Sequence, residues 1–403
     1  MSEKEIILIN ISGDDRPGIT RSVTEVLARH NANILDIGQA VIHETLSLGM
    51  LVEMSAEESS HAMKEMLFRV DEQGLSVKFS PIRGNEYQHW VQGKGKHRHI
   101  ITLLARRISA EQIAGVTAIA LEQELNIDKI ERLSGRVSLE EEQDSAKACV
   151  EFFVSGEIRD KLAVRQQFLE LAAKVGADIA FQEDNLFRRT RRLVCFDMDS
   201  TLIEAEVIDE LAKAAGVGGQ VSAITERAMR GELDFAESFA MRLALLKGLD
   251  ESVLERVANS LRLTEGAEHL ITTLRRYGFK TAIISGGFTY FGECLRKRLG
   301  FDYVYANELE VVDGQVTGRV VGRVVDGKRK AELLQEIAER EGISLQQVIA
   351  VGDGANDLPM LGKAGLGIAF RAKPIVKKEA DHAISTLGLD GILYLMGYRD
   401  REL

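Results

Sequence analysis

The stretch Leu193-Val194-Cys195-Phe196-Asp197-Met198-Asp199-Ser200-Thr201 decides the fold of the larger part of this chain. Its apolar first half is typical of a buried strand, and the two aspartates stand where that strand ends. Side chains two positions apart on a strand share a face, so Asp197 and Asp199 are expected to converge at the carboxyl end of a parallel strand. Open α/β sheets bind their ligands there. Taken alone, the pattern fits an acidic turn equally well.

Three further motifs follow in order, and together they favour one active site over four unrelated turns. The run Thr281-Ala282-Ile283-Ile284-Ser285-Gly286-Gly287 ends in a hydroxyl and two glycines, whose backbone N–H groups can approach a phosphate closely. Lys330 opens an amphipathic helix and can balance phosphate charge. The apolar run 348–351 leads into an acidic glycine loop, in which Asp353 and Asp357 offer the oxygen ligands that Mg²⁺ prefers.

This order of motifs closely resembles the haloacid dehalogenase-like phosphatases, over about residues 191–403. The resemblance implies a doubly wound parallel sheet of the Rossmann type, with Asp197 as nucleophile and Asp199 as general acid and base. It implies a Mg²⁺ cofactor held by Asp197, Asp199 and Asp353, with Asp357 behind them. By the same resemblance, a further set of residues binds the phosphorylated substrate: Ser285, Gly286, Gly287, Lys330 and Asn356.

The chemistry explains why these residue types are needed. A carboxylate nucleophile is repelled by an anionic phosphate ester unless a cation, Lys330 and N–H donors offset the charge. Asp197 would form an aspartyl-phosphate, and Asp199 would protonate the leaving alkoxide and then activate water. Asp199 must therefore be protonated when substrate arrives. Neighbouring carboxylates raise its pKa, whereas Mg²⁺ and Lys330 lower it, and the sequence leaves the direction open.

Residues 204–263 are expected to form a helical insert that covers the site and excludes water. Apolar residues recur there at helical spacing, first at Ile208, Leu211 and Ala212, and again at Phe239, Leu243 and Leu246.

Three segments of this region resemble the members of the family that hydrolyse phosphoserine: 197–206, 229–235 and 242–247. The resemblance implies that Glu206 meets the substrate ammonium and Arg242 its carboxylate, while Met229 and Phe235 close the apolar side of the pocket. A zwitterion needs one anion and one cation, and arginine can clamp a carboxylate with two hydrogen bonds. Arg230 is an alternative partner for the carboxylate. A solvated arginine and a core phenylalanine are the structural alternatives.

Residues 307–318 are expected to form a hairpin around the Asp313-Gly314 turn. It could serve as a flap over the site, but a structural ribbon is the simpler interpretation.

The first half of the chain contains a weak internal repeat. Strands and helices follow in the order βαββαβ in residues 1–85 and again in 98–185, with a polar linker at 83–97, which predicts two ferredoxin-like domains before the catalytic domain at 190–403. In the second copy the helix is expected over 113–125. Asn33-Ile34 and Asn126-Ile127 hold equivalent places in the two copies.

Both copies resemble ACT domains, which often bind amino acids. The first carries the loop Asp14-Asp15-Arg16-Pro17-Gly18-Ile19 before its helix, and the resemblance implies a serine effector contacted by Asp15, Gly18, Asn33 and Ile34. Gly18 would let a ligand approach the backbone, and the helix N-terminus favours its carboxylate. A capped helix start with an interface role is an equal alternative. The second copy, Arg106-Arg107-Ile108-Ser109-Ala110-Glu111, has no glycine there, so we expect it to serve in dimerisation.

Composition restricts the class of protein. The chain has 403 residues, 45% hydrophobic content and a net charge of −11, which argues against nucleic-acid binding because phosphate backbones require a basic surface. It contains no apolar run long enough to span a bilayer and no signal peptide at its start. Cys149, Cys195 and Cys294 show no paired spacing, which suggests reduced thiols in the cytoplasm.

Together, the resemblance and the composition predict a cytoplasmic, Mg²⁺-dependent phosphatase of phosphoserine that binds no membrane or nucleic acid and forms a homodimer. A phosphatase of another small ester, such as a phosphothreonine or a phosphosugar, is the nearest alternative. An amino-acid sensor without catalytic activity is the alternative from a different class.

Overall fold

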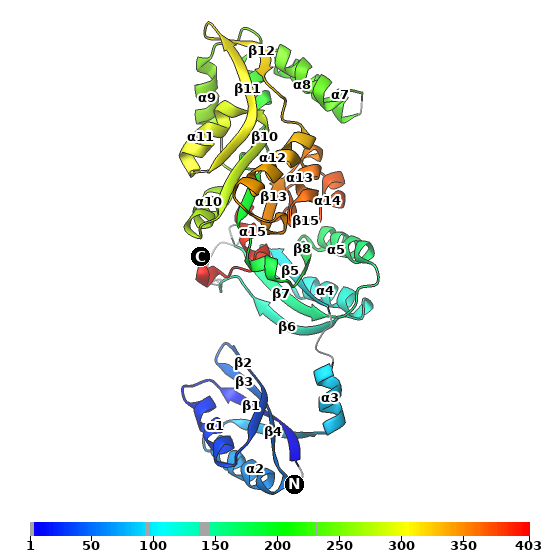
Figure 1. The fold of residues 1–403 in the computed structure, drawn as a ribbon, viewed down its shortest axis with the longest axis vertical. Helices are drawn as coiled ribbons and strands as arrows, with labels where there is room; N and C mark the ends of the chain where they lie inside the picture. Colours follow the sequence, from blue (N-terminus) through cyan, green and yellow to red (C-terminus); the bar gives the residue numbers. More distant parts are fainter. Residues whose placement is uncertain (1–3, 93–96, 137–145, 231) are drawn as a thin grey trace. The chain divides into compact units, whose positions relative to one another are not determined.

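The computed structural model describes residues 4–92, 97–136, 146–230 and 232–403, without the side chains of Met229 and Phe235. The predicted pocket roles of those two side chains therefore lie outside the described residues. The chain folds as two compact units, residues 1–96 and 97–403 (Figure 1). Within the described residues, no helix has the length and apolarity needed to cross a membrane.

The first unit has the predicted βαββαβ order, in which helices α1 and α2 cover one face of an antiparallel sheet. Its strands pair in the order β2-β3-β1-β4. Leu46, Leu48 and Met50 alternate along β3 into the core, as predicted. Most of the predicted linker is a helix, α3, which buries none of its side chains. The elements are β1 (Lys4–Asp14), α1 (Ile19–Arg29), β2 (Asn33–Ile42), β3 (Thr45–Ser55), α2 (Ala56–Asp71), β4 (Ser76–Ile82) and α3 (Gly84–Gln92).

The second unit begins with another βαββαβ domain. Its sheet order, β6-β7-β5-β8, matches that of the first copy position by position. Helix α4 ends at Glu122, three residues before its predicted end, because Glu124 adopts a left-handed φ of 56° that the helix cannot continue through. The elements are β5 (Arg98–Ala105), α4 (Ala110–Glu122), β6 (Asn126–Arg132), β7 (Ala148–Ser155), α5 (Lys161–Val175) and β8 (Asp178–Glu183).

The catalytic domain is built on a seven-stranded sheet in the order β12-β11-β10-β9-β13-β14-β15. All neighbouring strands run parallel except β11 and β12. The strands are β9 (Leu193–Phe196), β10 (Lys280–Phe288), β11 (Tyr303–Val312), β12 (Gln315–Val321), β13 (Val348–Gly352), β14 (Leu366–Phe370) and β15 (His382–Ile384).

Helices cover both faces of this sheet, which is the predicted doubly wound arrangement. Alternate residues of β9 enter the two cores: Val194 and Phe196 pack with α10 and α11, and Leu193 and Cys195 pack with α12, α13 and α14. The helices are α10 (Ala267–Arg276), α11 (Thr289–Leu299), α12 (Gly327–Arg340), α13 (Leu358–Lys363), α14 (Pro374–Glu379) and α15 (Ile392–Leu395), with short 3₁₀ turns η2 (Leu186–Arg189), η3 (Leu345–Gln347), η4 (Ala355–Asp357), η5 (Leu389–Gly391) and η6 (Asp400–Glu402).

The strand register brings the predicted motifs to one level of the sheet. Phe196 of β9 lies opposite Ile283 of β10 and Val351 of β13. The residues that follow these three positions therefore leave the sheet together at its carboxyl edge. The chain adds strands on one side of β9 and then on the other, so this edge is also the topological switch point where such sheets bind ligands.

The predicted insert is helical, and the predicted hairpin supports it. The insert consists of α6 (Val207–Ala214), α7 (Gly218–Met229), α8 (Phe235–Ala244) and α9 (Ser252–Ser260). The β11–β12 hairpin turns at Asp313 and Gly314, whose φ angles of 49° and 75° are those of a two-residue hairpin turn. At Gly318 the hairpin packs so closely on α8 that an added Cβ would lie 3.2 Å from the Cα of Ala244. The hairpin therefore serves as a structural ribbon for the insert.

The second βαββαβ domain packs against the catalytic domain. Leu104, Cys149 and Ala180, on the sheet face turned away from its helices, share a core with Tyr394 and Leu395 of the catalytic domain. This sheet face is therefore buried within the chain, and the dimerisation role predicted for this copy stays a prediction for its other surfaces.

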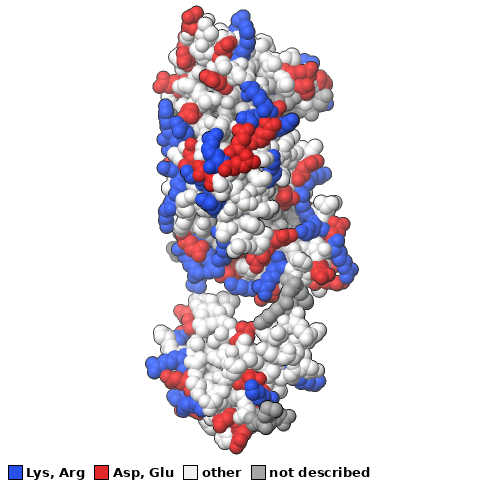
Figure 2. All heavy atoms as spheres, viewed as in Figure 1, with Lys and Arg blue, Asp and Glu red and all other residues white. Residues whose placement is uncertain are grey.

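Polar contacts reinforce this packing. Glu151 and Arg188 form an ion pair that is almost completely buried. Arg106, in the loop without glycine, binds Glu265 at 2.7 Å. Elsewhere the surface is mixed in charge, and Figure 2 shows acidic and basic side chains interspersed on the face in view.

Candidate active site

Both carboxylate oxygens of Asp197 are held by neighbouring donors. Its Oδ1 accepts a hydrogen bond from the backbone N–H of Met198 at 2.7 Å, and its Oδ2 lies 2.9 Å from Nζ of Lys330. Its own N–H donates to the carbonyl of Val351 at 2.8 Å, which ties the residue to the neighbouring strand. The carboxylate therefore has a single orientation at the carboxyl edge of the sheet.

Lys330 is completely buried and connects two of the motifs. Asp326 caps helix α12, and the first turn of that helix places Lys330 between Asp197 and Asp357, whose Oδ1 lies 2.7 Å from Nζ. Burial alone would lower the pKa of the Lys330 ammonium, but the charges of Asp197 and Asp357 outweigh it and raise the pKa above its usual value. Lys330 therefore remains a cation in the interior.

Asp199 is oriented by the start of the helical insert. Its Oδ1 accepts a hydrogen bond from the N–H of Val207, the first residue of α6, at 3.0 Å. Burial raises the pKa of the Asp199 carboxyl well above its usual range, and the charges of Glu206 and Asp197 raise it further. Among the protein groups, these effects outweigh the opposing charge of Lys330, so the pKa of Asp199 is raised. A protonated Asp199 is what a general acid requires.

Three carboxylates form a group that can hold a divalent cation. Ligand oxygens of Asp197, Asp353 and Asp357 all lie within 4.8 Å of one another. Burial raises the pKa of Asp353 to about 8 and that of Asp357 to about 7, with the charge of Asp197 adding to both. A divalent cation would relieve this repulsion, and hard oxygen donors suit Mg²⁺.

The predicted ligands differ in how well they fit this group. The carboxylate of Asp199 is not a member of it. Asp357 is a member, but its two oxygens already accept from Lys330 and from the N–H of Gly354 at 3.0 Å. This agrees with its predicted place behind the direct ligands.

The second motif lies inside strand β10 rather than in a free turn. Oγ of the buried Ser285 accepts a hydrogen bond from the N–H of Gly287 at 2.9 Å. A Cβ at Gly287 would lie 2.5 Å from Oδ2 of Asp199 and 2.7 Å from Cε of Met198. Glycine is needed there because the carboxylate of Asp199 lies directly against the backbone. Asn356, in η4, is half-buried, with its amide oxygen over Gly354.

Replacing Gly287 by alanine is therefore expected to displace Asp199. We expect a loss in kcat of about 10- to 100-fold, because small misplacements of a catalytic group are costly. The matched control is Gly219→Ala, at a helical position where an added Cβ meets nothing within 4 Å. Steady-state kinetics of both variants provide the measurement, and equal activity of the two would contradict the placement of Asp199.

The predicted substrate-recognition residues lie around the same site. Ser200, which has a left-handed φ of 54°, donates a hydrogen bond to Glu206 at 2.8 Å. Burial lowers the pKa of Arg242, and the charges of Asp209, Glu206 and Asp199 only partly offset this. Its guanidinium therefore lies within electrostatic range of these three carboxylates. Arg230 instead binds Glu232 at 2.7 Å on the exposed surface, which favours Arg242 of the two arginines.

Sequence reasoning missed several supporting residues. Thr201 donates to Asp353 at 3.3 Å. Asn307 joins the second and third motifs, because it donates to the carbonyl of Gly286 at 2.7 Å and accepts from the N–H of Val325 at 2.8 Å. Near Arg242, Oδ1 of Asp209 and Oγ of Ser238 are buried without a partner among the described residues. Thr201 could have been found because it belongs to the first motif. No pattern in the sequence marks Asn307, Asp209 or Ser238.

The predicted effector residues of the first unit lie on an open surface. Gly18 precedes α1 with a left-handed φ of 98°, and an added Cβ would meet nothing within 4 Å. Asp15, Asn33 and Ile34 are all exposed, the last two at the start of β2. The loop is accessible to a ligand or to another protein surface.

Comparisons with known proteins agree with this architecture. The ACT domain family matches residues 5–80, and the haloacid dehalogenase-like hydrolase family matches residues 194–362. Among solved structures, a HAD family hydrolase from Salmonella enterica superposes with a TM-score of 0.65 at 31% identity, over 75% of this chain and 100% of that one. A probable phosphoserine phosphatase from Vibrio cholerae superposes with a TM-score of 0.57 at 33% identity, over 74% and 86% of the two chains.

Full-length relatives extend the likeness to the whole chain. A phosphoserine phosphatase from Streptomyces coelicolor is 41% identical over 100% of this chain and 94% of its own. Phosphoserine phosphatase SerB2 of Mycobacterium tuberculosis is 40% identical over 100% of this chain and 96% of its own. The chain thus belongs to the phosphoserine phosphatase family of haloacid dehalogenase-like hydrolases.

Proposed function

We propose that this enzyme hydrolyses O-phospho-L-serine to L-serine and phosphate through an aspartyl-phosphate on Asp197, with Mg²⁺ as cofactor. The observation that carries the proposal is the buried pair of Asp197 and Lys330 beside Asp199, whose pKa is raised by burial and by the charges of Glu206 and Asp197. We propose further that the enzyme acts in the cytoplasm, which its unpaired cysteines favour, and that this reaction is the last step of serine biosynthesis.

The residues divide the chemistry between them. Oδ2 or Oδ1 of Asp197 attacks phosphorus in line, and the P–O bond to the serine oxygen breaks. Asp199 gives its proton to the departing alkoxide. The resulting carboxylate then takes a proton from the water that hydrolyses the aspartyl-phosphate, which restores both residues. Lys330, Ser285 and the amides at Gly286 and Gly287 offset charge on the phosphoryl oxygens.

Asp197 and Asp353 are the residues proposed to hold Mg²⁺, with Asp357 orienting Lys330 behind them. Asp199, which the sequence also predicted as a ligand, is assigned to proton transfer instead. When bound, the cation would offset the negative charge of the carboxylates and of the phosphate.

Selectivity for phosphoserine is proposed to depend on Arg242. We expect Arg242→Met to lower kcat/KM for phosphoserine by about 100-fold, because a charge-assisted carboxylate contact is lost. Turnover of p-nitrophenyl phosphate, which has no carboxylate, should change far less. Arg230→Met is the matched control and should behave as wild type. Equal losses for both substrates, or a larger effect in Arg230→Met, would contradict the assignment.

Serine is proposed to act as an effector through the first unit, with the exposed apolar strand β2 pairing in a homodimer. Ile37, Val41 and Ile42 of that strand are all exposed. The packing of the second βαββαβ domain shows that a truncation should begin at His97 and keep that domain.

A chain of residues 97–403 is expected to keep turnover and to lose sensitivity to serine by about tenfold, if the effector binds at the first unit. Phosphate release at increasing L-serine concentration provides the measurement. In the full chain, Asp15→Ala should reproduce the loss, and Asp184→Ala, at an exposed site of the second unit, should not. Unchanged inhibition of the truncated chain would place serine in the active site instead.

A further inference from the structure

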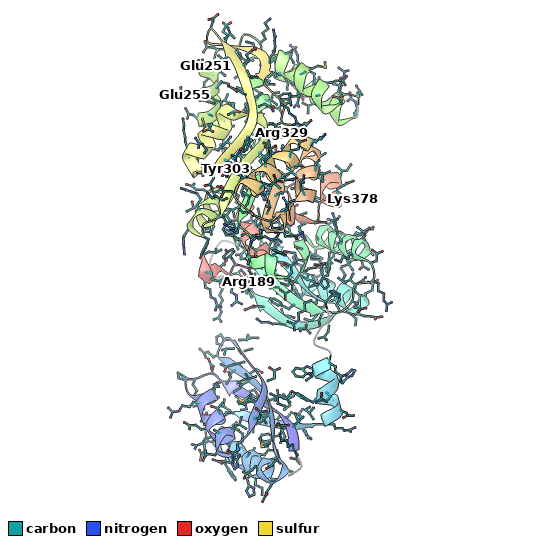
Figure 3. The ribbon with its side chains drawn as sticks, in the orientation of Figure 1. Arg189, Glu251, Glu255, Tyr303, Arg329 and Lys378 are labelled. Atoms are coloured by element: carbon teal, nitrogen blue, oxygen red, sulfur yellow. The ribbon has the colours of Figure 1, made fainter. Side chains whose placement is uncertain are left out.

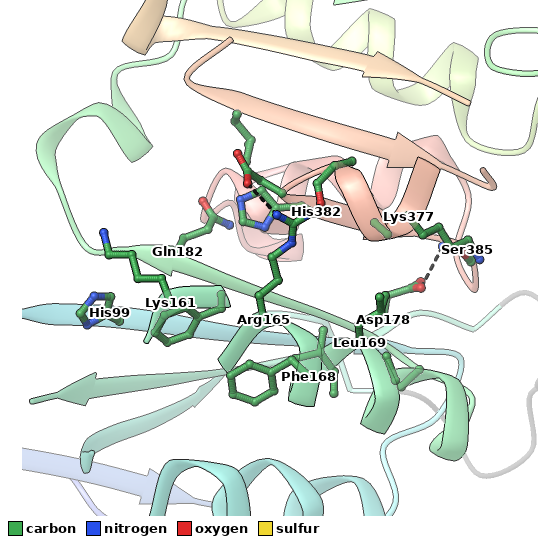
Figure 4. Close-up of a pocket in the computed structure, with 18 of the residues that line it drawn as sticks. His99, Lys161, Arg165, Phe168, Leu169, Asp178, Gln182, Lys377, His382 and Ser385 are labelled. Carbon is green, nitrogen blue, oxygen red and sulfur yellow. Dashed lines mark hydrogen bonds and ion pairs between the residues drawn. The ribbon is translucent and has the colours of Figure 1, made fainter. Parts of the chain in front are cut away.

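A cavity of about 510 Å³ lies within the unit 97–403, and none of the proposed active-site residues lines it (Figure 4). One wall is formed by α5 and β8 of the second βαββαβ domain. The other wall is formed by the catalytic domain around α14 and β15. A volume of this size suits a small organic molecule.

The wall contributed by the βαββαβ domain has an apolar surface beside its charged residues. The ring of Phe168 stacks on that of Phe181 at 5.7 Å, and Phe181 stacks on His99 at 5.0 Å. Leu169 extends this surface along α5. An aromatic or aliphatic ligand body can pack against these side chains.

The acidic groups of the cavity already have partners. Asp178 accepts hydrogen bonds from the N–H groups of Ser385 at 2.9 Å and Thr386 at 2.8 Å. Glu183 pairs with Lys161 at 2.5 Å. Asp381 pairs with Arg165 at 3.3 Å. These carboxylates are therefore not available to neutralise another cation.

Two cations of the cavity have no ion pair among the described residues: Lys377, which is half-buried and within electrostatic range of Asp178, and Arg191. The side chain of Arg191 is buried, and its Nη1 donates to the carbonyl of Gln346 at 2.5 Å. Throughout the part of the chain that the structure describes, no carboxylate lies within ion-pair distance of it. Burial, with the charge of Arg188, lowers its pKa to about 10, so the guanidinium stays charged at neutral pH. A buried charge without a counter-ion is unfavourable unless something neutralises it.

Two histidine side chains that line the same cavity each have a ring nitrogen without a hydrogen-bond partner among the described residues. These nitrogens are Nδ1 of His99 and Nδ1 of His382, and both are buried. His99 is 4% exposed. Figure 4 shows the ring of His382 beside Gln182 and Arg165, between the two walls.

We propose that this cavity binds a small organic monocarboxylate with an aromatic or aliphatic body. Its carboxylate neutralises Arg191, the imidazoles supply further hydrogen bonds, and Phe168 and Phe181 pack against its body. One buried arginine balances one negative charge, so a monoanion is favoured over a dianionic phosphate. Because the ligand contacts both walls, it stabilises the packing of the βαββαβ domain on the catalytic domain.

The test compares 2-naphthoate, a fluorescent aromatic carboxylate, with uncharged 2-naphthamide in titrations of the full-length protein. Two variants alter the cavity: Arg191→Gln removes the charge, and Leu169→Trp fills the space from a half-buried position. Arg189→Gln is the matched control, because Arg189 is exposed two residues away and does not line this cavity (Figure 3). Circular dichroism and phosphate release establish that each variant is folded.

We expect saturable one-to-one binding of 2-naphthoate, with binding of 2-naphthamide weaker by about tenfold or more because the charge-assisted contact is missing. Arg191→Gln and Leu169→Trp should each weaken the binding of 2-naphthoate by a similar factor. Arg189→Gln should bind it as tightly as the wild type does. If Arg191→Gln does not fold, the binding measured with Leu169→Trp alone tests the proposal. Equal binding of the two compounds, unchanged binding in a folded cavity variant, or no saturation by about 10 mM would overturn the proposal.

Discussion

Asp197→Asn is expected to lower kcat for phosphoserine by about four orders of magnitude or more, because the amide lacks the anionic oxygen that attacks phosphorus. The fold should survive, since an asparagine oxygen can still accept the hydrogen bond that Met198 donates to Oδ1. Single-turnover phosphate release, followed by mass spectrometry of the acid-quenched chain for added phosphate, provides the measurement. The wild type should carry the phosphate and the variant should not.

The matched control is Asp313→Asn, in the hairpin turn, where asparagine accepts the left-handed φ of 49°. It should turn over as wild type. Wild-type turnover by Asp197→Asn, with deamidation excluded by mass spectrometry, would remove Asp197 as the nucleophile.

Lys330→Met is expected to reduce kcat by about a thousandfold, because a buried cation no longer offsets charge on the phosphoryl group. It should also lower the free energy of unfolding by about 3 kcal/mol, because removal of one member of a buried ion pair leaves the other charge uncompensated. Here two carboxylates, Asp197 and Asp357, lose the same partner. Urea unfolding and steady-state kinetics provide the two measurements.

Lys328→Met is the control for this variant, because Lys328 is exposed on the same helical turn. It should change neither quantity. If Lys330→Met matched Lys328→Met in both, the buried lysine would have neither the catalytic nor the structural role assigned to it.

The sequence predicted those features that local pattern determines. Three of the four motifs are recognisable as apolar runs followed by polar residues, and parallel pairing of β9, β10 and β13 then brings them to one edge. The β11–β12 hairpin followed from Asp313-Gly314, because few residue pairs accept two left-handed angles in succession. Lys330 was predicted from its place at a helix start, although its complete burial could not be read from its neighbours.

Features that depend on packing between distant segments could not be predicted. Glu151 and Arg188 look like ordinary surface charges in the sequence, and only the docking of two domains makes them a buried pair. The same docking creates the cavity at Arg191 and buries one sheet face of the second βαββαβ domain. The upward shift in the pKa of Asp199 likewise depends on how completely the insert covers it.

The most direct test of the central claim is phosphate release from L-phosphoserine by the full-length protein, with Mg²⁺ and with a chelator. A panel of phosphothreonine, phosphosugars and p-nitrophenyl phosphate provides the comparison. We predict Mg²⁺-dependent turnover with a strong preference for phosphoserine. Equal turnover of the panel would contradict the assigned substrate, and turnover of phosphoserine that persists in the chelator would contradict the metal site. Absence of turnover on every substrate would contradict the proposed chemistry itself.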